Sequence, residues 1–167
     1  MTKRLYAKNC ETDSDYARFA KFYIAESYQF DRQLSLLETI GHLMTTLQDS
    51  RFMLYENAQG ELAAYLQYRY ESDGETVFIE SAILAEPYRS SWIFYRGFGD
   101  WVRKVENEHR GVRLVRFYVL ANQTYLNRLY AKFAKYVGER EGGTGREVVY
   151  ETAFADLWAY LKAGERK

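Results

Sequence analysis

The spacing of hydrophobic residues changes repeatedly along the chain, from the period of a helix to that of a strand. Helical spacing predicts helices over residues 12–27, 34–48, 91–108 and 124–134, and a short last helix over 155–161. Extended patterns predict strands over residues 3–8, 52–55, 62–70, 77–84 and 114–120, and a terminal hairpin of residues 136–140 and 148–154. Strands that alternate with helices, with hairpins towards both ends, predict one layered α/β (α+β) domain over residues 1–167.

Turn and capping residues support these boundaries. Thr12 and Asp15 have the spacing of a capping box, which predicts a helix start. Asn57–Gly60 lies between two apolar runs and predicts a hairpin turn. Gly142–Gly145 predicts another hairpin turn rather than a phosphate loop, because no lysine-serine/threonine ending or helix follows it. The strand at residues 77–84 is bulky on both faces, so we expect it in the middle of its sheet.

Two of the predicted helices carry an apolar face. In the second helix that face consists of Leu36, Leu37, Ile40, Met44 and Leu47. In the long helix the residues expected to point inward are Tyr95, Phe98, Trp101, Val102 and Val105. Gly97 and Gly99 weaken the first turns of the long helix, at a cost of roughly 1 kcal/mol each relative to alanine.

Composition excludes several classes of function. The chain has 23 Lys+Arg against 23 Asp+Glu, so a dominant contact with nucleic-acid phosphates is not expected. Cys10 is the only cysteine and the two histidines are His42 and His109, so we expect neither a disulfide nor a metal site. We see no signal peptide and no apolar stretch of transmembrane length, and we expect a cytoplasmic protein with no membrane partner.

The stretch from Thr76 to Phe133 orders a strand, a short arginine loop, a long helix, a strand, an asparagine and a helix. It carries the pair Tyr88-Arg89, then Asn122, then the run Leu129-Tyr130-Ala131-Lys132. This order resembles the core of the GNAT superfamily, the acyl-CoA-dependent N-acyltransferases. The resemblance implies a mixed, mostly antiparallel sheet flanked by helices, which splays open around Leu84 and Val119 to receive the cofactor.

The loop after the strand departs from the family's pattern. That pattern is Arg/Gln-x-x-Gly-x-Gly/Ala, in which small residues let a pyrophosphate approach free backbone N–H groups at a helix start. Arg89 matches the pattern, whereas Trp92 and Phe94 replace the two small residues. Ser90 and Ser91 supply hydroxyl donors that compensate in part. The alternative is that Trp92 and Phe94 only pack the helix onto the sheet.

The resemblance also assigns roles to single residues. It implies that acetyl-CoA or another acyl-CoA is the co-substrate. The implied cofactor site is formed by Ala82, Ile83, Leu84, Arg89, Ser90, Ser91, Trp92, Ile93, Phe94 and Asn122. It further implies that Glu80 takes the amine proton and that Tyr130 protonates the leaving thiolate. For Glu80 the alternative is an ion pair with an arginine across the sheet, such as Arg69 or Arg116, and for Tyr130 it is a place in the core.

Two functions follow from this reading. The first is transfer of an acetyl or other acyl group from acyl-CoA to a primary amine, on a small molecule or a peptide. The second is a GNAT-like domain that has lost turnover and serves as a binding or assembly module. The 16 tyrosines motivate it, because tyrosine and tryptophan are enriched in interfaces. Homodimers are common in the family, so a homodimer is a further expectation.

Overall fold

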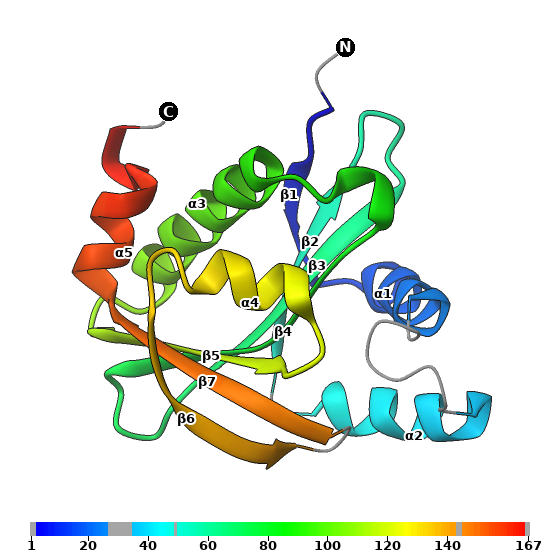
Figure 1. The fold of residues 1–167 in the computed structure, drawn as a ribbon. Coiled ribbons are helices and arrows are strands. Elements are labelled where there is room, and N and C mark those ends of the chain that lie inside the picture. The colour runs from blue at the N-terminus through cyan, green and yellow to red at the C-terminus, as the bar shows by residue number, and fades with distance from the viewer. Residues whose placement is uncertain (1–2, 27–34, 49, 143–144, 166–167) are drawn as a thin grey trace.

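The computed structural model describes residues 3–26, 35–48, 50–142 and 145–165, and the elements follow the predicted order (Figure 1). The strands are β1 (Tyr6–Asn9), β2 (Arg51–Glu56), β3 (Leu62–Tyr70), β4 (Thr76–Leu84), β5 (Leu114–Leu120), β6 (Lys135–Gly142) and β7 (Gly145–Ala153). The helices are α1 (Asp13–Ala25), α2 (Leu36–Thr46), α3 (Ser91–Glu108), α4 (Thr124–Tyr130) and α5 (Phe154–Leu161), with 3₁₀ turns at Glu86–Tyr88 and Ala163–Glu165.

The strands form one seven-stranded sheet in the order β1-β2-β3-β4-β5-β7-β6. Every neighbouring pair is antiparallel except β4 and β5, which run parallel across the connection made by α3. The prediction of a mixed, mostly antiparallel sheet is confirmed. β4 lies at the centre of this order, as its bulky residues on both faces indicated.

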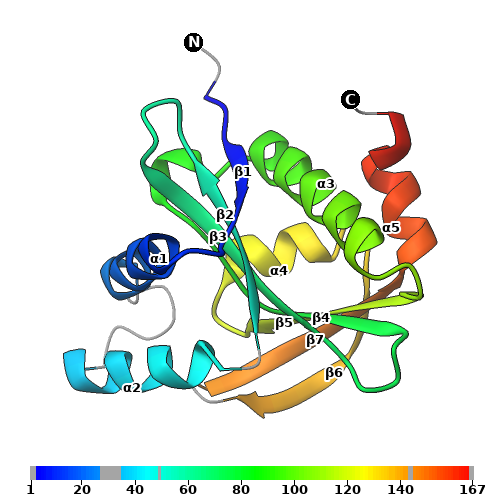
Figure 2. The same ribbon diagram turned by 180° about the vertical axis from the view of Figure 1, so that it is seen from behind.

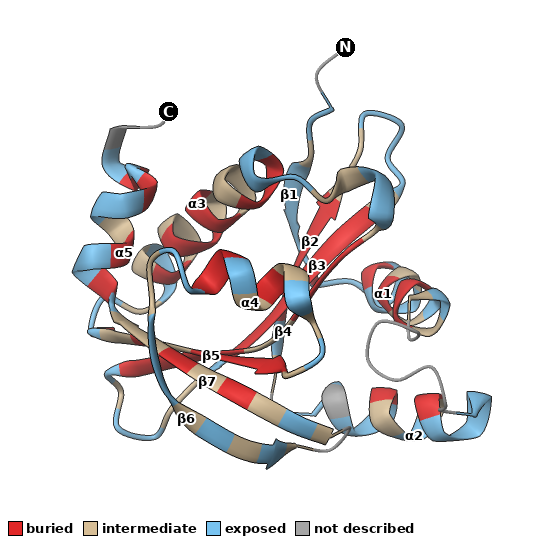
Figure 3. Cartoon of the chain, viewed as in Figure 1, coloured by how far each residue is buried: buried red, intermediate tan, exposed pale blue. Residues whose placement is uncertain are grey.

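Helices cover the two faces of the sheet unequally (Figures 1 and 2). The larger core lies under α3, α4 and α5, where Phe98, Trp101 and Val105 pack against the sheet. The smaller core lies on the opposite face, where Phe19 of α1 packs against the ends of β2 and β3. Burial concentrates in the sheet and in the inward side of these helices (Figure 3).

Helix α3 has the predicted bounds, and four of its five predicted inward residues are buried, Tyr95 being only half-buried. Gly97 has a packing reason. The Tyr55 hydroxyl donates a 2.7 Å hydrogen bond to the Gly97 carbonyl, and a Cβ at Gly97 would lie 3.2 Å from the Tyr55 ring. No helix in the described residues combines the length and the apolar character needed to cross a membrane.

Helix α2 does not bury the face that its apolar residues define. Leu36, Leu37 and Met44 are 64%, 79% and 65% exposed, whereas Thr39 and Leu43 are buried. The apolar pattern showed which residues share a face, but the fold decided which face meets the rest of the protein. The predicted helix ends at residues 27 and 34 lie outside the described residues.

Helix α4 is shorter than predicted. It ends at Tyr130, whose carbonyl accepts hydrogen bonds from the N–H groups of Phe133 and Ala134. This tight turn reverses the chain so that β6 begins at Lys135 and pairs with β7. The expected strand at residues 136–140 is correspondingly longer, while β5 has the predicted bounds.

Candidate active-site cleft

The sheet opens between its two parallel strands. β4 and β5 are paired only from Thr76–Ile79 to Leu114–Phe117, after which β4 continues beside β3 and β5 beside β7. The opening begins at Glu80 and Tyr118, several residues earlier than the predicted divergence at Leu84. The resemblance therefore located the opening on the correct pair of strands but too far along β4.

A β-bulge at Glu80 accounts for the early divergence. Tyr68 of β3 pairs with Ile79, and Gln67 pairs with Ser81, so Glu80 is the extra residue on β4. A bulge bends its strand and increases the local twist, which turns the end of β4 away from β5. It also redirects the side chain of the extra residue, and Glu80 here faces the opening.

A cleft of about 450 Å³ occupies this opening. Its walls come from α2, the strands that flank the opening and the β6–β7 hairpin. The lining residues are Tyr23, His42, Thr45, Gln48, Ser50, Gln67, Arg69, Glu80, Ser81, Ala82, Tyr118, Val119, Leu120, Gln123, Leu126, Arg140 and Glu147. This volume is within the range of small-molecule sites.

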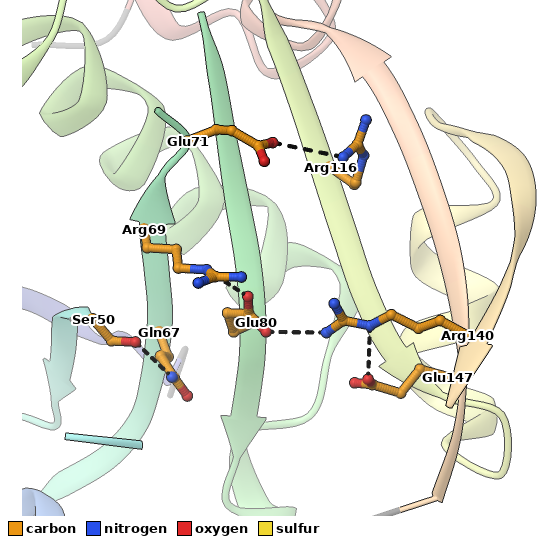
Figure 4. Close-up of polar contacts among 8 residues, drawn as sticks. All are labelled: Ser50, Gln67, Arg69, Glu71, Glu80, Arg116, Arg140 and Glu147. Carbon is orange, nitrogen blue, oxygen red and sulfur yellow. Dashed lines mark hydrogen bonds and ion pairs between the residues drawn. The ribbon is translucent and has the colours of Figure 1, made fainter. Parts of the chain in front are cut away.

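Four charged side chains form a row across the cleft (Figure 4). Arg69 Nε donates to Glu80 Oε1 at 2.8 Å, and Arg140 Nη2 donates to Glu80 Oε2 at 3.2 Å. Arg140 Nε donates to Glu147 Oε1 at 3.0 Å, and its guanidinium lies 3.3 Å from the centre of the Tyr118 ring. The row therefore alternates in sign from β3 to the terminal hairpin.

The two carboxylates of this row differ in their surroundings. Glu80 has an arginine on each oxygen, so the ion pair with Arg69 that was the alternative to a base role is present. The Glu147 side chain is only 13% exposed. Burial raises the pKa of Glu147, and the charge of Glu80 adds to this effect while Arg140 opposes it. Glu147 therefore holds its proton more tightly than an ordinary glutamate does.

Neutral polar groups complete the inner wall. Gln67 is 7% exposed, and its amide donates to the Ser50 hydroxyl at 2.9 Å (Figure 4). The Ser81 hydroxyl lies 2.9 Å from the hydroxyl of Tyr65. These contacts orient the side chains, and in the described part of the chain no buried amide or hydroxyl of this wall lacks a partner.

A second charged group lies on the same face of the sheet but outside the cleft lining. Arg116 of β5 pairs with Glu151 of β7 at 2.8 Å and with Glu71 at 3.7 Å. Arg69 and Arg116 both lie over the ring of Phe78, at 5.0 and 5.4 Å from its centre. Both arginines thus pack on the same ring, but only Arg69 of these two lines the cleft.

The arginine loop lies at the far end of β4. Arg89 Nε donates to the Leu84 carbonyl at 3.1 Å, which fixes the guanidinium at the strand end. Ser90 caps α3, because its hydroxyl accepts from the Ile93 N–H at 3.1 Å. Ala82 lines the cleft, whereas Ile83 and Leu84 belong to the two hydrophobic cores.

The two bulky loop residues lie in different environments. Trp92 is 45% exposed, with the Arg96 guanidinium 5.1 Å from its ring centre. Phe94 is buried and packs 5.2 Å from Phe98 and 5.9 Å from Tyr130. Packing of the helix onto the sheet therefore explains Phe94, as the alternative expected, but does not explain Trp92. With Ser91, Trp92 instead borders a groove of about 230 Å³ between α3, α4 and α5.

Tyr130 occupies the core rather than the cleft. Its side chain is 1% exposed, and its ring stacks on Phe117 with centres 4.7 Å apart. Burial raises the pKa of Tyr130, which keeps the hydroxyl protonated. Asn122 is exposed at the end of β5, and its neighbour Gln123 is the residue that lines the cleft.

Tyr125 was not singled out from the sequence. Its hydroxyl is buried without a hydrogen-bond partner in the described part of the chain. Burial raises the pKa of Tyr125, and the charge of Arg89 opposes this effect.

Sequence reasoning also missed Glu147 and Arg140. A signal was present, because both residues are equally far from the glycine turn and pair directly across the hairpin. What the sequence did not show is that this pair reaches over β5 to Glu80. Among the described residues, no cluster of three potential metal ligands is found.

Comparison with solved structures places this geometry in a known fold. Ribosomal-protein-S5-alanine acetyltransferase from Vibrio fischeri aligns with a TM-score of 0.66 at 9% identity, over 94% of this chain and 97% of that one. Spermidine N-acetyltransferase from Vibrio cholerae, solved with CoA and spermine, aligns with a TM-score of 0.65 at 10% identity, over 92% and 98%. A GNAT-family acetyltransferase from Streptococcus pneumoniae gives 0.64 at 12% identity, over 90% and 99%.

The chain therefore has the fold of the GNAT acetyltransferases, along nearly its whole length. No protein-family model matches the sequence, and no curated protein matches it either. At these low identities the similarity concerns the fold.

Proposed function

We propose that this protein is an N-acyltransferase that moves an acetyl group from acetyl-CoA to a primary amine. The observation that carries the proposal is the opening of the parallel pair at the Glu80 bulge. It places a polar cleft with two carboxylates beside a strand end that carries Arg89. A thioester held in such an opening has an amine site on one side and an anion site on the other.

The residues present suit acetyl-CoA as co-substrate. The Arg89 guanidinium and the first turn of α3 offer donors to a pyrophosphate, since free N–H groups and the helix dipole favour an anion there. The buried Tyr125 hydroxyl has a hydrogen bond to give that no described residue receives. Trp92 is 45% exposed, so core packing does not oppose a rotation of its indole away from a phosphate.

In the proposed reaction the amine nitrogen attacks the thioester carbonyl, a C–N bond forms and the C–S bond breaks. The nitrogen loses one proton before the attack and a second as the amide forms. Glu80, or a water that it holds, is proposed to receive the first, and Glu147 is a second cleft carboxylate that can receive the other; one proton in net is released to solvent. Backbone N–H groups near Ala82 would polarise the carbonyl. The thiolate then gains one proton from a hydroxyl. Tyr130 is the donor that the resemblance implies, but it lies in the core at 1% exposure, so Tyr125, whose hydroxyl has no partner among the described residues, is the second candidate.

Isothermal titration with acetyl-CoA, with free CoA in parallel, tests the proposal. We expect binding with a Kd on the order of micromolar, as for ordinary enzyme substrates. If a folded sample binds neither ligand at millimolar concentration, acetyl transfer from CoA is ruled out. The GNAT-like binding module, in which the cleft holds a partner without turnover, then becomes the better description.

Replacement of Arg89 separates cofactor binding from turnover. Arg89→Ala is expected to raise the Kd for acetyl-CoA about tenfold, because a charge-assisted hydrogen bond to phosphate contributes about 1.5–3 kcal/mol. The kcat at saturation should change much less. Arg113→Ala is the control, since that side chain is 82% exposed and distant from the loop. An unchanged Kd in Arg89→Ala would remove Arg89 from the cofactor site.

A further inference from the structure

The four charged residues in the row across the cleft differ in how many hydrogen-bonding partners they have. Its inner members, Glu80 and Arg140, are each hydrogen-bonded on both sides. Among the described residues, its end members, Arg69 and Glu147, are each bonded on one side only. The row therefore ends in a cation on β3 and in an anion on β7, and both line the cleft.

Each end retains unused hydrogen-bonding capacity. Arg69 uses only its Nε, so its two terminal nitrogens donate to no acceptor among the described residues. An arginine fork of this kind matches a carboxylate in two parallel hydrogen bonds. Glu147 accepts through Oε1 alone, and its Oε2 receives no donor from the described part of the chain. A carboxylate oxygen of this kind suits an ammonium group.

The surroundings of Arg69 and Glu147 affect how strongly each can bind a ligand. Glu147 is 13% exposed, and a Cβ at Gly142 would overlap its carboxylate, so the glycine leaves the room that the side chain occupies. Arg140 is held against the ring of Tyr118 and separates Glu147 from Glu80. A charge in a partly buried place such as that of Glu147 interacts more strongly than a charge in water, whereas the Arg69 side chain is 43% exposed and so is open to a ligand.

We propose that the acceptor is a small zwitterion, an amine that also carries a carboxylate, bound with its carboxylate on Arg69 and its ammonium on Glu147. The proposal rests on the acyltransferase function and specifies its substrate class. A polyamine would bring two cations to a cleft that already contains Arg69 and Arg140. A plain alkylamine would bring no carboxylate to the terminal nitrogens of Arg69, and a dicarboxylate would meet both glutamates. A zwitterion complements both ends of the row.

A panel of matched acceptors tests the class. Acetyl transfer is followed by release of the CoA thiol, which the buried Cys10 disturbs little. The panel holds α- and ω-amino acids, each beside its carboxamide, together with putrescine and spermidine. We expect kcat/KM for the best amino acid to exceed that of its carboxamide by about tenfold or more, the effect of one charge-assisted pair.

Two pairs of variants attribute the preference to the ends of the row. Arg69→Gln is expected to remove the preference for the carboxylate, and Arg69→Lys to restore part of it. Arg116→Gln, altered at the arginine that shares the Phe78 ring but lies outside the cleft, should retain it. Likewise Glu147→Gln should raise the KM for the amino acid about tenfold, whereas Glu151→Gln should not.

The outcomes separate the substrate class from the reaction. Equal rates with carboxamides, or higher rates with polyamines, overturn the zwitterion while acetyl transfer stands. If no amine is acetylated, the reaction fails, and titration of the same amino acids into the protein decides the ligand class. Binding that Arg69→Gln abolishes and Arg116→Gln retains supports the zwitterion, and absence of binding overturns it.

Discussion

At the scale of single residues, the surroundings decide what each side chain can do. Glu80 and Glu147 are the same residue type and line the same cleft. Glu80 is held by two arginines, whereas Glu147 is held by one and is more deeply buried. Burial raises the pKa of Glu147. Glu80, which the resemblance implied as the base, is thus held by more ion pairs than Glu147.

Two helical glycines show the same dependence on surroundings. We predict that glycine-to-alanine substitution has opposite effects on stability at the two positions. Gly41→Ala in α2 meets no atom within 4 Å and should raise the free energy of unfolding by up to about 1 kcal/mol, the propensity difference. Gly97→Ala places a methyl 3.2 Å from the buried Tyr55 ring, which is anchored by its own hydrogen bond. We expect a net loss of about 1 kcal/mol there, because overpacking outweighs propensity.

Urea unfolding of both variants checks this pair. Stabilisation by Gly97→Ala would show that the Tyr55 ring can move away, and that the close approach has no structural role.

At the scale of elements, local chemistry sets where helices begin. Thr12 caps α1 and Asp15 completes the capping box, as the spacing predicted. Asp15 accepts the N–H groups of Glu11 and Thr12 and pairs with Lys8 at 3.0 Å. The backbone hydrogen bonds, with the Lys8 contact, hold the pKa of Asp15 well below its usual range.

This depressed pKa predicts a pH dependence of stability. The folded state favours the ionised Asp15, so its contribution is present above the unfolded pKa of about 4 and is lost as the pH falls. Asp15→Ala should lower the free energy of unfolding by about 2 kcal/mol at pH 7 and by less near pH 3. Asp13→Ala, altered at an exposed residue in the same turn, is the control. A difference that does not shrink towards pH 3 would contradict this account.

At the scale of the whole molecule, the opening of the sheet separates two groups of strands, and Arg140 links them. It lies on the edge strand β6, crosses the ring of Tyr118 on β5 and reaches Glu80 on β4. A single side chain therefore ties the terminal hairpin to the central strand. The same contact sets the distance between the two cleft carboxylates.

Removal of this link should destabilise the protein measurably. Arg140→Met leaves Glu80 and Glu147 without their common partner, and we expect a loss of about 1–2 kcal/mol, since the site is only partly screened by solvent. The melting temperature should fall by about 5 °C. Arg146→Met in the same hairpin, with a pair that is largely exposed, should change stability by less than about 0.5 kcal/mol. Equal effects would mean that Arg140 makes no special link.

Much of the fold could be predicted because its signals are local. The bounds of α3 and β5 follow from residue spacing, and the start of α1 follows from its capping box. The buried face of α2 could not be predicted in this way. Its apolar residues share one side of the helix, yet that side is exposed, because packing against α1 and the sheet selects Thr39 and Leu43.

The candidate site was predictable only in part. Glu80, Ala82 and Arg89 lie along one continuous stretch, so resemblance to a linear motif could find them. Arg140 and Glu80 are 60 residues apart and meet only because β5 and β7 bring the hairpin beside β4. A pattern of neighbouring residues in the sequence cannot show that two residues so far apart in the chain are in contact.

The sequence by itself determined the order of the elements, the capping and turn positions and the likeness to GNAT proteins, because these depend on neighbours along the chain. The tertiary structure decided three further features. These are the point at which the bulge at Glu80 opens the sheet, the burial of Tyr130 in the core, and the row of charges from Arg69 to Glu147. Each depends on which strands and helices become neighbours in space, and that is set by packing of the whole domain.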